Sequence, residues 1–108
     1  MLDLYTLRTC DTCRKALTAL RAAGHDPQAR DVRAEGIDAG DLAAITGQHG
    51  EAALNRASTT WRGLSEAEKA EDPAVLLARH PTLLKRPAIL RDGTWTLGWK
   101  PDVQARYL

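Results

Sequence analysis

The hydrophobic pattern at the start of the chain changes from a continuous run to a helical spacing. An apolar run predicts a buried strand over residues 2–7, and apolar residues at three- and four-residue intervals then predict a helix over residues 11–23. Gly24 stands where a C-terminal cap belongs. An alternating stretch over residues 28–33 predicts a second strand. This order is typical of a βαβ unit with parallel strands.

The middle of the chain is helical in pattern and interrupted by turn signals. Apolar residues after Asp38 indicate a helix, and the polar stretch over residues 55–63 predicts a loop. Ser65 and Glu68 have the spacing of a capping box. Asp72-Pro73 then predicts the start of another helix, which should end near His80-Pro81.

The last third of the chain returns to a strand pattern. Two short β-like runs, residues 87–90 and 94–97, flank an Asp-Gly pair, which is a strong signal for a hairpin. Residues 102–107 predict a final helix. The order of elements favours an α/β fold of thioredoxin type: a βαβ unit, a helical insertion, a β-hairpin and a C-terminal helix on a mixed four-stranded sheet. We expect residues 1–108 to form a single domain.

Charge and composition exclude several classes of function. The chain has 15 Lys and Arg against 14 Asp and Glu, a net charge of +1, so a broadly basic nucleic-acid surface is not expected. No apolar run approaches the roughly 18–20 residues of a membrane span. We therefore expect a cytoplasmic protein, a monomer, with neither a membrane nor a nucleic acid as a direct partner.

The only two cysteines, Cys10 and Cys13, lie where the predicted strand turns into the predicted helix. A helix N-terminus favours a thiolate, and a cysteine there can have its pKa lowered from about 8.5 to between roughly 3.5 and 7.5. Cys10 is therefore the candidate nucleophile. Cys13, one turn further on, is its candidate redox partner. The neighbouring cations favour the thiolate and Asp11 opposes it; these cations are Arg8, Arg14 and Lys15.

Two other interpretations of the cysteine pair remain. A structural zinc site needs further ligands, but the three histidines are scattered along the chain, so no metal site is expected. Both cysteines could alternatively be small buried residues.

Two later arginines are candidate anion ligands. Arg62 ends a polar loop, where a surface charge is the alternative, and Arg86 precedes Pro87 in a context compatible with a cis peptide bond.

Three motifs in order resemble the arsenate reductase (ArsC) family, which includes Spx-type regulators and a group of small proteins without a settled role. The motifs are the run from Leu4 to Ala16 with its cysteine pair, the loop Thr59-Thr60-Trp61-Arg62, and Lys85-Arg86-Pro87 before a hairpin. The resemblance covers essentially the whole chain. It implies a thioredoxin-like fold with an inserted helical segment.

The resemblance also implies roles for individual residues. Cys10 matches the cysteine that attacks arsenate in the glutaredoxin-coupled reductases, which then use glutathione. Arg62 and Arg86 match two arginines that bind the oxyanion, and Pro87 matches a proline expected to be cis. Lys100 stands where the family has a third arginine, so it keeps the charge without the planar contact.

Cys13 stands where arsenate reductases usually have serine, and here the chain is similar to the Spx-like redox pair. The leading hypothesis is a thiol reductase without a bound cofactor, with glutathione as co-substrate, glutathione or glutaredoxin as partner, and a small oxyanion as a candidate substrate. In it, Cys10 attacks, and Arg62 and Arg86 bind an oxyanion or a glutathione carboxylate. The alternatives are an Spx-like regulator that binds RNA polymerase through a Cys10–Cys13 switch, and a family fold without activity.

Overall fold

Four strands form one mixed sheet in the computed structural model, which describes residues 2–108. They are β1 (Leu2–Thr6), β2 (Pro27–Asp31), β3 (Ala88–Arg91) and β4 (Thr94–Leu97), in the order β2-β1-β3-β4. β1 pairs in parallel with β2 and antiparallel with β3, and β3 pairs antiparallel with β4. The predicted thioredoxin-like α/β fold with a mixed four-stranded sheet is thus confirmed.

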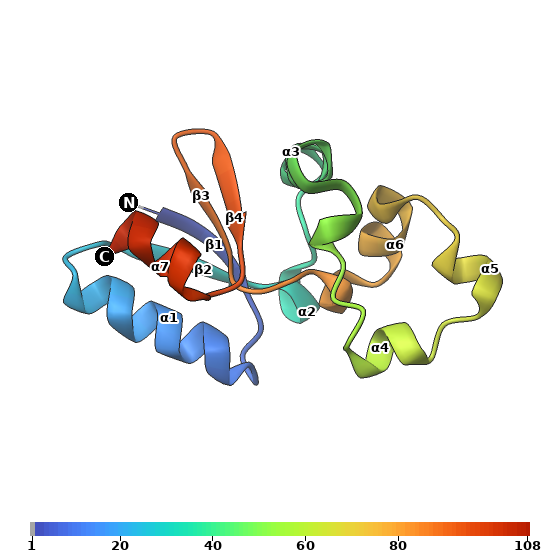
Figure 1. Cartoon of the computed structure of the whole chain (residues 1–108), viewed down its shortest axis with the longest axis horizontal. Coiled ribbons are helices and arrows are strands. Elements are labelled where there is room, and N and C mark those ends of the chain that lie inside the picture. The colour runs from blue at the N-terminus through green and yellow to red at the C-terminus, as the bar shows by residue number, and fades with distance from the viewer. Residues whose placement is uncertain (1) are drawn as a thin grey trace.

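Two helices, α1 (Asp11–Ala22) and α7 (Pro101–Tyr107), cover one face of the sheet (Figure 1). Side chains from β1 and β3 alternate between the two faces, as the pleat requires. On this face the buried cluster joins the sheet to both helices, and its members are Leu2, Leu4, Leu20, Ile89, Val103 and Tyr107.

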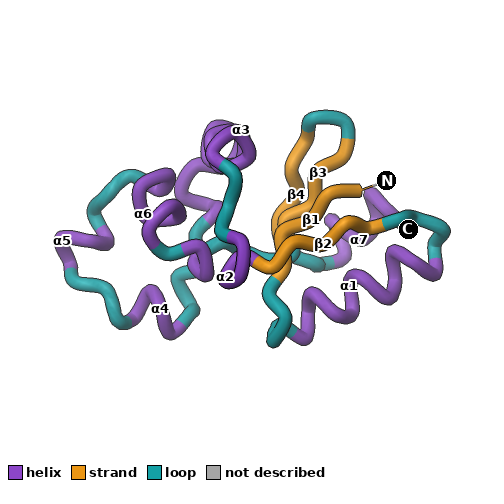
Figure 2. The backbone as a smooth tube through the Cα atoms, turned by 180° about the vertical axis from the view of Figure 1, so that it is seen from behind, coloured by secondary structure: helices purple, strands orange, loops and turns teal. Residues whose placement is uncertain are grey.

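A helical segment between β2 and β3 packs beyond the other face of the sheet (Figures 1 and 2). Its elements are α2 (Val32–Glu35), α3 (Ala39–His49), the 3-10 turn η1 (Gly50–Ala53), α4 (Thr59–Arg62), α5 (Glu66–Lys69), α6 (Pro73–Arg79) and the 3-10 turn η2 (Pro81–Leu83). The larger core cluster lies here, where Tyr5 and Trp95 stack with ring centroids 5.8 Å apart and pack with Ile45 and Leu76. The segment makes the molecule elongated, 44 × 26 × 25 Å.

Most predicted boundaries differ from the observed ones by one residue, and two predictions differ by more because a side chain caps a helix. The second strand ends at Asp31, because Asp31 Oδ1 accepts hydrogen bonds from the backbone N–H groups of Arg33 and Ala34 and so starts α2. The stretch predicted as a loop contains α4, because Ser58 Oγ accepts a hydrogen bond from the backbone N–H of Trp61.

Other local predictions are confirmed. Ser65 and Glu68 form the capping box of α5, and Pro73 is the first residue of α6. In the hairpin turn, Asp92 and Gly93 have φ values of 50° and 81°, the left-handed values of the turn type that Asp-Gly favours.

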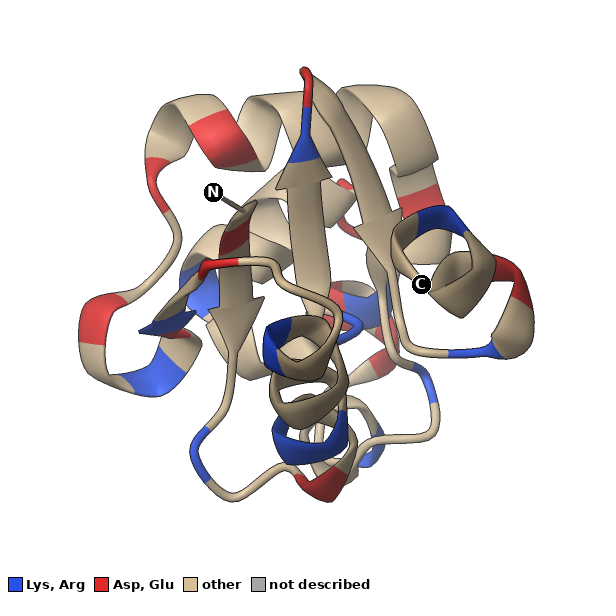
Figure 3. Ribbon diagram, turned by 90° about the vertical axis from the view of Figure 1, so that its left-hand side faces the viewer, with Lys and Arg blue, Asp and Glu red and all other residues tan. Residues whose placement is uncertain are grey.

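Basic and acidic residues are interspersed over the elements seen in Figure 3. Among residues 2–108, no helix combines the length and the apolar character that crossing a membrane requires.

Candidate active site

Cys10 is the N-terminal cap of α1, at the end of the connection from β1. Its backbone is extended (φ −88°, ψ 113°), and its Sγ accepts a hydrogen bond from the backbone N–H of Cys13 at 3.4 Å. The Cys10 N–H donates to the carbonyl of Leu7 at 2.9 Å. Asp31 Oδ2 accepts from the N–H of Arg8 at 2.7 Å and so ties this connection to the end of β2. The predicted position of Cys10 at the helix N-terminus is confirmed.

Cys13 is buried on the face of α1 that packs on the sheet, with only 1% of its surface exposed. Both cysteines are free thiols. Burial, together with the hydrogen bond between the two side chains and the nearby charge of Cys10, raises the pKa of Cys13 to about 12. Cys13 is therefore held as a protonated thiol that donates to the sulfur of Cys10.

Cys10 has the opposite tendency. Partial burial opposes its ionisation, but the side-chain and backbone hydrogen bonds from Cys13 and the charge of Arg86 outweigh burial, so the pKa of Cys10 is lowered from its ordinary value. The cation responsible is Arg86, which is far away in sequence, and not the cations expected beside Cys10. Of those, Arg14 forms an ion pair with Asp11.

Arg86 is held between η2 and β3, and the peptide bond to Pro87 is cis, as the resemblance implied. Its Nη1 donates to the main-chain carbonyl of Thr82 at 2.8 Å. Its Nε is buried and has no hydrogen-bond partner among the described residues. The hydroxyl of Thr82 lies 3.1 Å from the hydroxyl of Thr60 in α4. A guanidinium with a free buried N–H beside a thiolate is suited to bind an anion.

The loop singled out from sequence therefore reaches Arg86 through Thr60. Arg62 is exposed, and its Nη2 donates to the carbonyl of Ala57 at 2.7 Å. Within residues 2–108 no hydrogen bond or ion pair joins Arg62 to Cys10 or to Arg86. Its part in binding stays a prediction.

Lys100 and Arg86 line the same pocket of about 400 Å³. The pocket also contains Lys85, and its other lining residues are Asn55, Leu97, Gly98 and Asp102. Three cations and one carboxylate make it suited to an anionic group.

Sequence reasoning did not find the roles of Thr60, Thr82 and Asp31, since these roles depend on contacts between segments far apart in the chain. Nowhere in residues 2–108 do three or more His, Cys, Asp or Glu side chains form a cluster able to hold a metal ion.

Comparison with known proteins places this arrangement in a family. The chain is 36% identical to an uncharacterised protein of Haemophilus influenzae, over 99% of each chain. The solved structure of the YFFB protein matches with a TM-score of 0.87 and 35% identity, over 100% of this chain and 99% of that one. An arsenate reductase (ArsC) related protein from Brucella melitensis matches with a TM-score of 0.75 and 34% identity, over 98% and 92%. The model of the ArsC family matches residues 5–106, and the chain belongs to the ArsC family.

Proposed function

We propose that this protein is a glutathione-coupled thiol reductase in which Cys10 is the nucleophile. One arrangement carries the proposal: a cysteine sulfur that receives a backbone N–H at 3.4 Å and a buried neighbouring thiol, next to the charge of Arg86. These groups stabilise a thiolate, the form that attacks sulfur or an oxyanion centre. The relative from Brucella melitensis, described as related to arsenate reductase, agrees with thiol chemistry of this kind.

In the reaction, the Cys10 thiolate attacks the glutathione sulfur of a mixed disulfide. The bond between Cys10 and glutathione forms as the substrate's S–S bond breaks, and the substrate leaves as a thiolate with the electron pair and takes a proton from water. A second glutathione thiolate then attacks the glutathione sulfur on Cys10 and regenerates its thiolate. In each turnover one free glutathione is consumed: it pairs with the glutathione taken from the substrate to form glutathione disulfide, and the substrate sulfur is released as a thiol.

The pocket beside Arg86 would bind the glutathione. Lys85, Arg86 and Lys100 line it, and glutathione carries two carboxylates. Arg62, on α4, is a further candidate for a carboxylate at the rim. Cys13 is a poor second nucleophile because its thiol stays protonated and buried. We therefore propose that glutathione or glutaredoxin, and not Cys13, resolves the adduct on Cys10.

The test is mass spectrometry after treatment with glutathione disulfide, together with steady-state reduction of a glutathionylated peptide and of arsenate. We expect one glutathione on Cys10 of the wild type, none in Cys10→Ser, and the same adduct in Cys13→Ser. Turnover should be lost in Cys10→Ser. Unchanged turnover in Cys10→Ser would reject the proposal, and turnover of arsenate alone would assign the oxyanion as substrate.

A second candidate is a redox switch of the Spx type, favoured by the direct contact between the two free cysteines. Oxidation would join Cys10 and Cys13 in a disulfide and release two electrons and two protons to an oxidant such as hydrogen peroxide. A pull-down of RNA polymerase by reduced and oxidised protein tests it. Binding in only one state supports the switch, and no binding in either state rejects it.

A further inference from the structure

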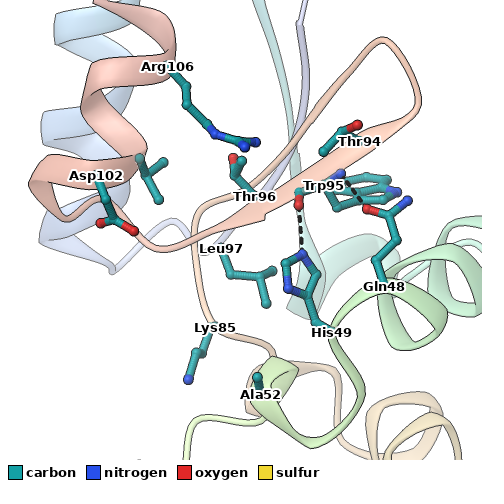
Figure 4. Close-up of a pocket in the computed structure, with 11 residues that line it drawn as sticks. Gln48, His49, Ala52, Lys85, Thr94, Trp95, Thr96, Leu97, Asp102 and Arg106 are labelled. Carbon is teal, nitrogen blue, oxygen red and sulfur yellow. Dashed lines mark hydrogen bonds between the residues drawn. The ribbon is translucent and has the colours of Figure 1, made fainter.

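The most extensive of the pockets described lies beside β4, and Cys10 does not line it. It has a volume of about 700 Å³ and follows the outer edge of β4, between the C-terminal end of α3 and α7 (Figure 4). It continues into the pocket beside Arg86, since Lys85, Leu97 and Asp102 line both. A ligand bound in the pocket at Arg86 can therefore extend along β4.

Part of the edge of β4 is closed by side chains from α3. The amide of Gln48 accepts from the N–H of Trp95 at 2.8 Å and donates to the carbonyl of Gly93 at 2.9 Å. His49 Nε2 lies 2.6 Å from the carbonyl of Trp95 (Figure 4). Gln48 and His49 thus occupy the N–H and the carbonyl of Trp95, the groups with which a neighbouring strand would pair. An extended chain cannot pair with the edge of β4 at Trp95.

The end of β4 nearest Arg86 is open. Leu90 pairs with Trp95 and Ala88 with Leu97, so the backbone groups of Leu97 point the same way as those of Trp95, away from β3. They face the cavity, which Leu97 lines. An extended ligand has one free backbone position here, directly beside the pocket for glutathione.

The charges of the cavity favour an acidic ligand. Arg106 extends from α7 toward Thr96, and Lys85 lies at the opposite end of the cavity (Figure 4). Both cations are exposed, and neither forms an ion pair with any described residue, whereas Asp102 is the one carboxylate in the lining. Opposite charges on a ligand raise association rates and exclude basic competitors.

We infer that this cavity binds the peptide part of the disulfide substrate, and that the substrate class is a glutathionylated peptide or protein with acidic residues beside its cysteine. The inference rests on the proposed function. Glutathione occupies the pocket at Arg86, and the peptide extends past Leu97 toward Arg106. The bonds that form and break are those of the reduction above, with the peptide as the leaving thiolate.

The first experiment measures kcat/KM for two glutathionylated peptides that differ only in Glu-Glu or Gln-Gln after the cysteine. We expect the wild type to prefer the acidic peptide roughly fivefold, the effect of about one surface ion pair. Arg106→Gln should reduce that ratio to half or less. Arg21→Gln is the matched control, because Arg21 is an exposed arginine of α1 that does not line the cavity. Equal rates for both peptides in the wild type, or an unchanged ratio in Arg106→Gln, would overturn the inference.

The second experiment needs no reaction. The acidic peptide, with serine in place of cysteine, is titrated into ¹⁵N-labelled protein, and we expect the amide signals of Thr96, Leu97 and Val103 to shift. Shifts confined to α1, or none at millimolar peptide, would overturn the cavity as the binding site. Shifts along β4 without turnover of any disulfide would support the cavity and reject the proposed reductase, so the two failures are distinct.

Discussion

Nη1 of Arg86 donates a 2.8 Å hydrogen bond to the main-chain carbonyl of Thr82. The Thr82 hydroxyl in turn contacts the hydroxyl of Thr60. Thr60 of α4 therefore positions the turn η2, and η2 positions the guanidinium of Arg86. Arg86 lowers the pKa of Cys10, and this series of contacts therefore links α4 to the reactivity of the thiol.

Thr60→Val should weaken the connection between α4 and Arg86 by removing the hydrogen bond to Thr82. Valine keeps the shape of threonine and removes the hydroxyl, so we expect a loss of roughly 0.5–1.5 kcal/mol in stability and a rise in the pKa of Cys10. The measurement is the pH dependence of Cys10 alkylation in Cys13→Ser protein. Thr59→Val is the control, since Thr59 is the exposed neighbour on the same turn. A shift of equal size in both variants would mean that Thr60 acts only through general stability.

Substitutions of Cys13 should show whether this residue acts as a hydrogen-bond donor to Cys10 or as a second redox group. Cys13→Ser keeps a donor to the sulfur of Cys10, whereas Cys13→Ala removes it and leaves a small cavity. We expect the pKa of Cys10 to rise more in the alanine variant, and turnover with glutathione to survive in the serine variant. Loss of turnover in both variants would instead indicate that a Cys10–Cys13 disulfide is an obligatory intermediate.

The extent to which the site could be predicted depended on sequence separation. Cys10 at the start of α1 and the turn at Asp92-Gly93 follow from local signals, because capping and turn geometry involve neighbouring residues. The identity of the cation that acts on Cys10 does not follow from local signals. Arg14 was expected to help, but it pairs with Asp11, and the effective charge comes from Arg86, which only the tertiary fold brings to the thiol. Propensity carries no information on such contacts.

Stability should fall in alkaline solution. Burial raises the pKa of Tyr5 to about 12, helped by its 2.5 Å hydrogen bond to Asp41, and the pKa of Cys13 is also about 12. In the unfolded chain Tyr5 and Cys13 lose their protons near the ordinary pKa values of tyrosine, 10.0, and cysteine, 9.0, so stability is lost as pH rises toward 12. Each group contributes a slope of up to about 1.4 kcal/mol per pH unit.

Urea unfolding at several pH values between 9 and 12 measures that slope. Tyr5→Phe and Cys13→Ser should each reduce the slope by the contribution of one titrating group, whatever their effect on stability at pH 7. A slope that is the same in wild type and both variants would show that other groups dominate alkaline unfolding.

Asp31 should stabilise both α2 and the connection before Cys10. Asp31→Ala removes the cap of α2, at a cost of about 1 kcal/mol, and leaves the N–H of Arg8 without its acceptor. Asp31→Asn has one carbonyl oxygen, so it can keep the cap but not both contacts. Backbone N–H groups, that of Arg8 first, lower the pKa of Asp31, so its contribution is present above the ordinary carboxyl range and is lost as pH falls through the folded pKa.

Urea unfolding at pH 7 and at acid pH compares the two variants, with Cys10 alkylation as the second readout. We expect Asp31→Asn to retain most of the stability at pH 7 but to lose the acid-dependent part. If Cys10 alkylates identically in the wild type and in Asp31→Ala, the contact with Arg8 has no effect on the thiol.

The contact of Gln48 and His49 with β4 has a consequence for the growing chain. Both residues precede Trp95 by more than 40 positions, so the ribosome delivers α3 before it delivers the hairpin. Gln48 and His49 are thus available when β4 emerges, so the backbone groups of Trp95 are not left free to pair with another nascent chain. A circular permutant that begins between α3 and β3 would reverse this order and expose the edge first.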